Sequence, residues 1–395
     1  MIVAKVWDRG MEGRFLLHRA SSSFILATEE VITISVGEKK APPTARICIF
    51  DPPAVLVGYS QDVYEEVNVD EAKKLGFDIN RRPTGGGAIV MIRENTPGWE
   101  LWLPRDYPGL PATIEGLYEY LSNVVIEALK RLGIDARFRP KNDIDVNGRK
   151  ISGTGLYTYG NGLMFCGTIL LDLDVLTMPR VLKIPIEKLS DKTVKDVSKR
   201  IITVKEILGY APSLDRVVEA YRHGLEAVLN LRTEPGDLLP YEKELLNRIE
   251  ARYRSHEWIY EFRRAEGYNR ICTYKTPYGL IRIHLKIVQN VLESIMITGD
   301  LFTYPEKALL DLEAYLKHTP IDMVRNEIIN FFAERNAKIY GLDAHQLANL
   351  ITSCIEGKQL SITSSKTSIA IQSTPPQKLY RAMYSSAICI DKVHR

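Results

Sequence analysis

The stretch Arg81-Arg82-Pro83-Thr84-Gly85-Gly86-Gly87-Ala88 decides how the rest of the chain is interpreted. Pro83 fixes one backbone angle of the bend, and the three glycines remove every side chain from the loop. Backbone N–H groups exposed in this way are able to converge on an anion. The two arginines carry forked donors that suit phosphate or carboxylate oxygens. The pattern is typical of an anion-binding loop; the alternative is a flexible turn with two solvated arginines.

The segments on either side of this loop read as strands. Residues 77–80 lead into it and residues 88–92 leave it, both with strand-forming composition. In the dinucleotide-binding fingerprint the glycine-rich loop instead opens a helix. A Rossmann fold is therefore not expected.

A second informative stretch runs from Lys141 to Gly153, with the sequence Lys-Asn-Asp-Ile-Asp-Val-Asn-Gly-Arg-Lys-Ile-Ser-Gly. Its central Asn-Gly predicts a tight hairpin. Across the hairpin, Asn142, Asp143 and Lys150 are able to face one site. A lysine there would place a positive charge on a polarised carbonyl and on phosphate, and the asparagine and aspartate would orient a hydrated Mg²⁺. The alternative for Lys150 is an ordinary exposed lysine.

Composition narrows the class of protein. The chain has 395 residues, 45% hydrophobic and 26% charged, which predicts two or three globular domains. A net charge of +3 is too weak to indicate nucleic acid. No apolar run approaches the roughly 18–20 residues of a membrane span, and early charges rule out a signal peptide. We expect a cytoplasmic protein with neither nucleic acid nor membrane as partner.

Cysteine and histidine usage excludes several mechanisms. The five cysteines are widely spaced, without a Cys-x-x-Cys pair, which fits a reducing compartment and gives no zinc or iron–sulfur pattern. Of seven histidines only His18 precedes residue 222. The first half of the chain therefore has almost no histidine with which to form a Ser-His-Asp or Cys-His catalytic site.

The pattern of helices and strands predicts an α+β fold. Residues 1–255 form a large domain with a mixed or antiparallel sheet packed by helices, beginning with a helix after Ser21 in which Glu29 and Glu30 face solvent. Residues 256–357 form a small α+β domain with a three-stranded meander and three helices. The tail, residues 358–395, is rich in serine and threonine and is predicted to be weakly ordered.

Two further features leave alternatives open. Cys166 opens a predicted strand at residues 167–173, where it is either a nucleophile or a small buried hydrophobe. Seven lysines and arginines against three acids lie between Lys183 and Lys205. This run is either a solvated face or a dock for an acidic partner.

Taken together, the glycine loop and the hairpin resemble the lipoate–protein ligases of the biotin/lipoate ligase superfamily. The resemblance covers about residues 20–208, including Gly167-Thr168-Ile169-Leu170-Leu171, and resumes at residues 297–302 in what resembles the accessory domain of that family. The Arg-Arg-x-Thr-Gly-Gly-Gly form is the lipoate type, because a biotin ligase would carry Gly-Arg-Gly-Arg there.

The resemblance implies an ATP- and Mg²⁺-dependent enzyme that converts lipoate to lipoyl-AMP. It then implies transfer of the lipoyl group to a lysine of a lipoyl domain, of the 2-oxoacid dehydrogenase E2 type, or of a glycine-cleavage H protein. Lys150 would be the catalytic lysine, and Asp143 would lie on the magnesium side. The implied lipoyl-adenylate and ATP-binding residues are Arg82, Thr84, Gly85, Gly86, Gly87, Ala88, Asn142, Gly153 and Thr168.

Two positions depart from the family pattern: Met91 and Cys166 each stand where the family has a histidine. The choice between lipoate and octanoate therefore stays open. One alternative is an octanoyl or lipoyl transferase of the same fold that uses Cys166 and a thioester donor. Another is a non-catalytic protein that binds an acyl-adenylate or a lipoyl domain.

Overall fold

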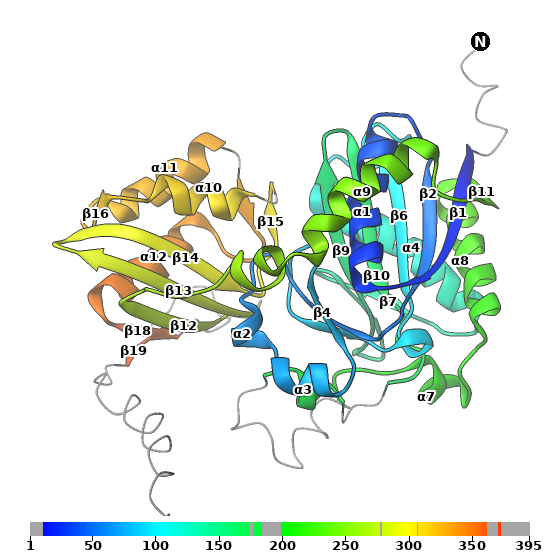
Figure 1. Cartoon of the computed structure of the whole chain (residues 1–395), viewed down its shortest axis with the longest axis horizontal. Coiled ribbons are helices and arrows are strands. Elements are labelled where there is room, and N and C mark those ends of the chain that lie inside the picture. Colours follow the sequence, from blue (N-terminus) through cyan, green and yellow to red (C-terminus); the bar gives the residue numbers. More distant parts are fainter. Residues whose placement is uncertain are drawn as a thin grey trace, which may run out of the picture. The chain divides into compact units, whose positions relative to one another are not determined.

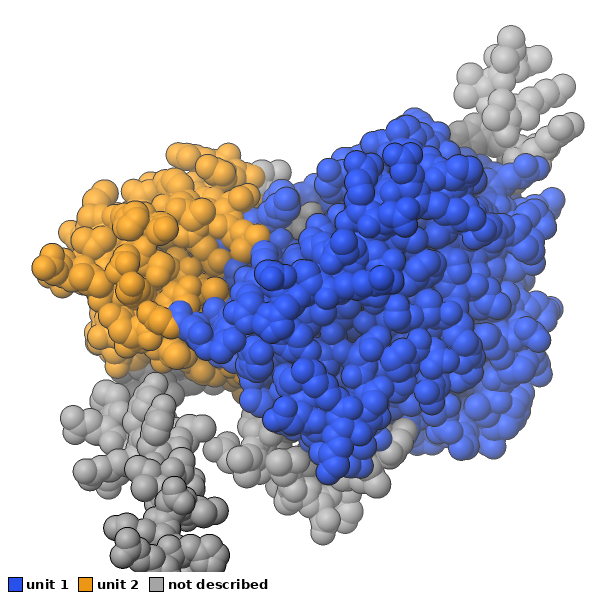
Figure 2. All heavy atoms as spheres, in the orientation of Figure 1, with its two compact units in different colours: residues 1–266, 298–309 blue, residues 267–297, 310–395 orange. Residues whose placement is uncertain are grey.

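A computed structural model describes residues 11–173, 177–183, 199–276, 279–305, 307–335, 337–361 and 370–372. The chain divides into two compact units, coloured separately in Figure 2. The first comprises Met1–Glu266 with Thr298–Leu309, and the second comprises Gly267–Ile297 with Leu310–Arg395. The domain limits expected from the sequence stay predictions.

The first unit is built on an eight-stranded mixed sheet with the order β11-β1-β2-β6-β10-β9-β8-β7. Its strands are β1 (Met11–Ala20), β2 (Thr44–Phe50), β6 (Gly98–Pro104), β7 (Arg137–Arg139), β8 (Asp143–Val146), β9 (Arg149–Tyr159), β10 (Gly162–Thr168) and β11 (Leu231–Pro235). β1 pairs in parallel with β2 and β11, and the other pairs are antiparallel. This confirms the predicted α+β class.

Helices cover both faces of this sheet, as Figure 1 shows. They are α1 (Ser22–Gly37) and α9 (Pro240–Arg254) on one face, and α4 (Ile114–Arg131) and α8 (Leu214–Leu229) on the other. Alternate residues of β6 separate the two layers: Trp99 packs with the core of α4 and α8, whereas Trp102 packs with α1. As predicted, α1 begins after Ser21, whose side chain accepts a hydrogen bond from the N–H of Phe24.

A smaller sheet with the order β4-β3-β5 carries the glycine loop. Its strands are β3 (Ala54–Val57), β4 (Asp78–Arg81) and β5 (Ile89–Met91). The loop joins β4 to β5, so it connects two strands as expected. The remaining short elements of the unit are α2 (Val63–Glu66), α3 (Val69–Lys74), the 3-10 turn η2 (Arg93–Asn95), α5 (Met178–Val181), α7 (Val204–Leu208), the π-helical turn η4 (Glu257–Glu261) and β15 (Thr303–Tyr304).

The second unit contains the predicted meander and three helices. Its elements are β12 (Arg270–Thr276), β13 (Gly279–Val288), β14 (Val291–Gly299), α10 (Ala308–Tyr315), β16 (Thr319–Pro320), α11 (Val324–Arg335), β17 (Lys338–Ile339), α12 (Ala344–Glu356), β18 (Gln359–Ser361) and β19 (Ala370–Gln372). β18 and β19 pair antiparallel, so this part of the predicted weakly ordered tail is regular. Residues 362–369 and 373–395 lie outside the described residues.

Three local expectations were wrong. Cys166 lies inside β10, which spans residues 162–168, rather than opening a strand at residues 167–173. Cys272 and Cys354 form a disulfide although the sequence indicated a reduced set, because β12 and α12 bring together residues 82 positions apart. Glu29 is buried rather than facing solvent. Among the described residues, no helix has the length and apolar character needed to span a bilayer.

Candidate active site

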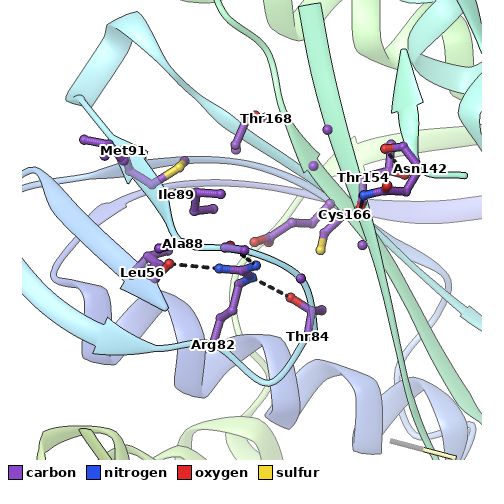
Figure 3. A pocket seen from close by; sticks show the side chains of 18 of the residues that line it. Leu56, Arg82, Thr84, Ala88, Ile89, Met91, Asn142, Thr154, Cys166 and Thr168 are labelled. Carbon is purple, nitrogen blue, oxygen red and sulfur yellow. Dashed lines mark hydrogen bonds between the residues drawn. The ribbon is translucent and has the colours of Figure 1, made fainter. Parts of the chain in front are cut away.

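Arg82 holds the glycine loop in place through hydrogen bonds from its guanidinium group. Its Nε donates to Thr84 Oγ1 at 3.0 Å, and its Nη1 donates to the Leu56 carbonyl at 2.9 Å, as Figure 3 shows. Its Nη2 donates to the carbonyls of Gly85 and Gly87, at 2.8 and 2.6 Å. Burial lowers the pKa of Arg82 to about 10. In this structure the fork of donors therefore organises the loop itself.

Arg81 has a similar environment one residue earlier. Its fully buried guanidinium donates only to main-chain carbonyls, those of Gly58, Tyr59, Gln61, Trp258 and Ile259. Burial, and then repulsion from Arg263, lower the pKa of Arg81 to about 9. Within the described part of the chain, no carboxylate forms an ion pair with Arg81 or Arg82.

Residues 299–302 of the first unit, here called the strap, lie directly on the glycine loop. The N–H of Gly86 donates to the carbonyl of Leu301 at 3.0 Å. A Cβ atom at Gly85 would lie 2.3 Å from that carbonyl oxygen, and one at Gly86 would lie 2.5 Å from the Phe302 ring. Gly86 also has a φ of +90°, which favours glycine. These glycines are thus required by a close approach of chain to chain.

The predicted hairpin is confirmed, and it places Lys150 over a glycine. β8 and β9 join at the Asn147-Gly148 turn, and Lys150 Nζ forms an ion pair with Asp143 Oδ1 at 2.6 Å. A Cβ atom at Gly153 would lie 2.6 Å from Lys150 Nζ, so the lysine folds back across this residue. Burial alone would raise the pKa of Asp143, but Lys150 and Arg139 hold it below its usual value.

Asn142 is fixed by the strand that faces it. Its Nδ2 donates to the Thr154 carbonyl at 2.9 Å, and its own carbonyl accepts from the Thr154 N–H at 2.8 Å. Its orientation is therefore set by β9, the same strand that carries Lys150.

One cavity of about 320 Å³ joins the loop to the hairpin. Its volume lies in the range of small-molecule sites. The predicted residues that line it are Arg82, Thr84, Gly85, Gly86, Gly87, Ala88, Asn142, Lys150, Gly153 and Thr168. Asp143 is outside the lining but contacts Lys150. Met91 and Cys166, which replace the family histidines, also line the cavity.

The floor of the cavity is a row of polar residues on the central sheet. Arg46, Glu100 and Cys166 are register partners on β2, β6 and β10. Arg46 forms a buried ion pair with Glu100, and Cys48 Sγ donates to Glu100 Oε1 at 3.5 Å. Glu29 of α1 completes the group. Of these residues, Glu29, Cys48, Glu100 and Cys166 line the cavity.

Burial controls the charge of these groups. It raises the pKa of Glu29 well above the usual value, and the neighbouring Glu100 adds to the effect. Burial likewise raises the pKa of the Cys166 thiol, with Glu29 and then Glu100 as further causes. The Cys166 thiol is therefore protonated near neutral pH, and Glu29 holds its proton more tightly than a free carboxyl does.

The sequence contained a signal for some of these residues. Glu29 lies on the same helical stripe as Ile25, Ile32 and Val36, so the 3.6-residue period places it on the buried face. Glu100 is the single acid in an otherwise apolar strand, which is unusual for a central strand. Phe302, which also lines the cavity, gives no such signal, because it reaches the loop from more than 200 residues away.

The donor groups fit a magnesium ion that arrives with a nucleotide better than a resident metal. Among the residues that the structure describes, no group of three or more His, Cys, Asp or Glu side chains could hold a metal ion. Asp143 offers a single carboxylate beside Lys150. Magnesium bound together with phosphate oxygens and water needs only one or two protein carboxylates.

Comparisons with known proteins identify a family for the first unit. Residues 21–226 match the family model described as the lipoyl protein ligase A/B catalytic domain. Octanoyltransferase LipM of Kyrpidia tusciae is 30% identical over 269 residues, which are 62% of this chain and 97% of the relative.

Two solved structures are similar in fold and sequence. A bi-partite lipoate protein ligase from Thermoplasma acidophilum, studied with its E2 lipoyl domain, has a TM-score of 0.57 at 27% identity, over 63% of this chain and 96% of the other. Lipoate-protein ligase A bound with ATP has a TM-score of 0.55 at 25% identity, over 63% and 98%. The chain therefore belongs to the lipoyl protein ligase A/B catalytic domain family and is an enzyme of the lipoate ligase and octanoyltransferase kind.

Proposed function

We propose that this chain is an ATP-dependent ligase that attaches a lipoyl-type acid to a protein lysine. The observation that carries the proposal is that the side-chain-free wall at Gly85–Gly87 and the Lys150–Asp143 ion pair line or border one cavity. Acyl adenylation must bring a carboxylate and a triphosphate together, so it needs positive charge and positioning more than proton transfer. The site supplies these groups, and none of the described residues that line it is a histidine.

The reaction has two steps. In the first, a carboxylate oxygen of the acid bonds to the α-phosphorus of ATP, and the bond to pyrophosphate breaks. In the second, the ε-amine of an acceptor lysine bonds to the acyl carbonyl, AMP leaves, and the amine loses a proton. The nucleophile of the second step belongs to the acceptor, so this chain needs none of its own.

The residues of this chain have distinct tasks in the proposal. Lys150 neutralises charge on the carboxylate and α-phosphate oxygens, while Asp143, which also pairs with Arg139, holds the Lys150 ammonium at the cavity mouth. Arg82 fixes the loop, so that the acid lies along a wall without side chains. A magnesium ion, held by Asp143 and by phosphate oxygens, would supply further charge neutralisation when bound.

An octanoyltransferase is the second candidate, and the naming of the Kyrpidia tusciae relative favours it over the ligase. In that reaction the Cys166 thiolate would take the octanoyl group from a thioester and pass it to the lysine. The environment of the thiol opposes this: burial, Glu29 and Glu100 raise the pKa of Cys166, and a thiol with a raised pKa is a poor nucleophile at neutral pH.

One experiment separates the candidates. The purified chain is incubated with a lipoyl domain in two reactions. One contains lipoate, ATP and Mg²⁺, and the other contains an octanoyl thioester without ATP. The mass of the lipoyl domain is then measured by mass spectrometry. The ligase proposal expects acylation only with ATP, together with lipoate-dependent ATP–pyrophosphate exchange. Acylation from the thioester that is lost in Cys166→Ser would establish the transferase. Tight binding of an acyl-adenylate without any transfer would indicate a non-catalytic protein.

Lys150→Ala tests the named catalytic group. Loss of one electrostatic donor to the reacting oxygens costs on the order of 100- to 1000-fold in rate. The matched control is Lys130→Ala, which removes an exposed lysine on α4 that pairs only with Glu127. Equal rates for the Lys150 variant and the control would contradict the assignment.

The acceptor and the setting of the reaction also remain proposals. We expect a lipoyl domain of the E2 type or a glycine-cleavage H protein as acceptor, and we expect the reaction in the cytoplasm, where ATP is available. The basic run between Lys183 and Lys205 stays a prediction as an acceptor dock, because Lys188, Lys192 and Lys195 lie outside the described residues.

A further inference from the structure

The cavity is polar at its closed end, which is unusual for a site that receives a hydrocarbon chain. Its mouth is marked by Lys150, whose side chain is 36% exposed. The inner end is formed by Glu29, Glu100 and Cys48, which are 6%, 3% and 0% exposed. Between the two ends the wall is apolar, with Leu26, Phe50, Leu56 and Met91 among its members. A medium-length acid with its carboxylate at Lys150 would thus direct the far end of its chain toward the inner group.

At the inner end, formed by Glu29, Glu100 and Cys48, the charge of Glu100 is balanced without a ligand. Arg46 and Glu100 form a buried ion pair, so they neutralise each other. In the described part of the chain no lysine or arginine forms an ion pair with Glu29. Burial, and then the neighbouring Glu100, raise the pKa of Glu29 well above its usual value, so the Glu29 carboxyl holds its proton more tightly than a free carboxyl does. The inner end therefore combines a paired Arg46 and Glu100 with the buried carboxyl of Glu29, whose raised pKa Arg46 and Arg82 only partly oppose, and it is rich in hydrogen-bonding atoms.

The inventory of these atoms determines what suits them. Glu100 already accepts from Arg46 and from Cys48. A protonated carboxyl has one O–H donor and a carbonyl oxygen with acceptor capacity, so Glu29 is able to offer both. The Cys48 and Cys166 thiols are weak donors and acceptors on the same floor. A terminal methyl group would remove water from these atoms and give them no hydrogen bond in return.

We propose that the inner end of the cavity selects a medium-chain carboxylic acid that carries a hydroxyl or thiol on the distal part of its chain over an unsubstituted alkyl acid. This inference rests on the proposed function, since it takes the cavity to be the acyl site. Glu29 is the specificity-determining residue, and Arg46 is a positioning residue that holds Glu100. A site arranged to hydrogen-bond a substrate hydroxyl rejects the analogue that lacks it far more strongly than an apolar pocket rejects an added hydroxyl.

The test compares two acids of equal chain length, octanoate and 8-hydroxyoctanoate, by isothermal titration to the whole chain. We expect the hydroxylated acid to bind at least about tenfold more tightly to the unmodified protein. Equal binding, tighter binding of octanoate, or no binding of either acid would overturn the inference. The comparison needs no variant, so its outcome does not depend on a mutant that fails to fold.

Variants assign the preference to Glu29. Glu29→Leu removes the hydrogen-bonding atoms at similar volume, and we expect it to abolish or reverse the preference. Glu29→Gln keeps an acceptor and a donor and should retain it. Glu30→Gln is the matched control on α1, because Glu30 pairs with Arg252 and Tyr253 and does not line the cavity. A preference that survives Glu29→Leu, in a variant with an unchanged circular dichroism spectrum, would overturn the role of Glu29.

The binding and activity measurements distinguish a failure of the selectivity proposal from a failure of the ligase proposal. If 8-hydroxyoctanoate binds tightly but supports no ATP–pyrophosphate exchange, the ligase proposal fails and the selectivity stands. If exchange occurs and kcat/KM is as high for octanoate as for the hydroxylated acid, the ligase proposal stands and the selectivity is overturned.

Discussion

Buried arginines lie at two places in the first unit, the glycine loop and the central sheet, and differ in what satisfies them. Arg81 and Arg82 at the glycine loop donate to uncharged carbonyl and hydroxyl oxygens, and burial lowers their pKa values to about 9 and about 10. Burial would also lower the pKa of Arg46 on the floor, but the carboxylate of Glu100 raises it above its usual value. An arginine that donates to uncharged carbonyls keeps its positive electrostatic potential. The potential of an arginine paired with a carboxylate is instead cancelled by its partner.

This difference gives the cavity two chemically distinct ends. At the glycine loop Arg82 lines the cavity, and among the described residues no carboxylate forms an ion pair with it, which favours an anionic ligand there. The floor carries the paired charges of Arg46 and Glu100 and a buried carboxyl with a raised pKa, Glu29, which favours a neutral polar group. The same residue type thus contributes to anion binding at one end and to selectivity at the other.

Removing Arg46 is expected to have the largest effect on stability. Arg46→Met leaves Glu100 as an uncompensated buried charge, which costs about 3–5 kcal/mol in the free energy of unfolding. The double variant Arg46→Met with Glu100→Leu removes both charges and should regain most of that loss. Urea unfolding of the three proteins measures both quantities. A double variant as unstable as the single one would contradict the neutralised-pair interpretation.

Arg81→Met should destabilise by roughly 2–3 kcal/mol, because five buried carbonyls lose a donor. No second substitution is expected to restore this loss, since the partners are main-chain atoms. The matched control is Arg131→Met at a surface ion pair of α4, which should change stability by less than about 0.5 kcal/mol. A loss in Arg81→Met no larger than in the control would show that water replaces the guanidinium.

Gly86→Ala tests the close approach between loop and strap. Gly133 offers a control with nearly the same φ, +89° against +90°, but with no atom within 4 Å of an added Cβ. Gly133→Ala should cost about 1 kcal/mol for the backbone strain alone. Gly86→Ala should cost about 1 kcal/mol more, because its Cβ would meet the Phe302 ring. In a Phe302→Ala background, Gly86→Ala should cost only the backbone strain, because the contact with the ring is gone. Urea unfolding measures each step.

The smallest effect concerns pH. Burial, with Arg46 as the next cause, lowers the pKa of His18 to about 3. Because the unfolded histidine binds its proton near pH 6.5, the unfolded state gains protons first as the pH falls. Stability contributed by neutral His18 is therefore present above about pH 6.5 and is lost progressively toward pH 3. His18→Gln should reduce the stability lost between pH 7 and pH 5.5 by about 1 kcal/mol in urea titrations. An unchanged loss would contradict the assignment.

The sequence predicted the parts of the site that local chemistry determines. Gly85–Gly87 indicate their loop because few other residues adopt such a bend, and Asn147-Gly148 sets the hairpin that presents Lys150. The polar floor was missed because Glu29 was assigned to solvent without regard to its place on the apolar stripe of α1. The row of Arg46, Glu100 and Cys166 depends on strand register, which no single stretch of sequence contains.

The strap has a consequence for how the protein can be divided. In sequence it follows β14, most of which belongs to the second unit, yet residues 298–309 belong to the first. A truncation after Glu266 would discard Leu301 and Phe302, which leaves the Gly86 N–H without its acceptor and opens one side of the cavity. Splitting the gene between the units would therefore place one wall of the cavity on the smaller polypeptide, and the larger fragment would have to recruit that polypeptide to rebuild it.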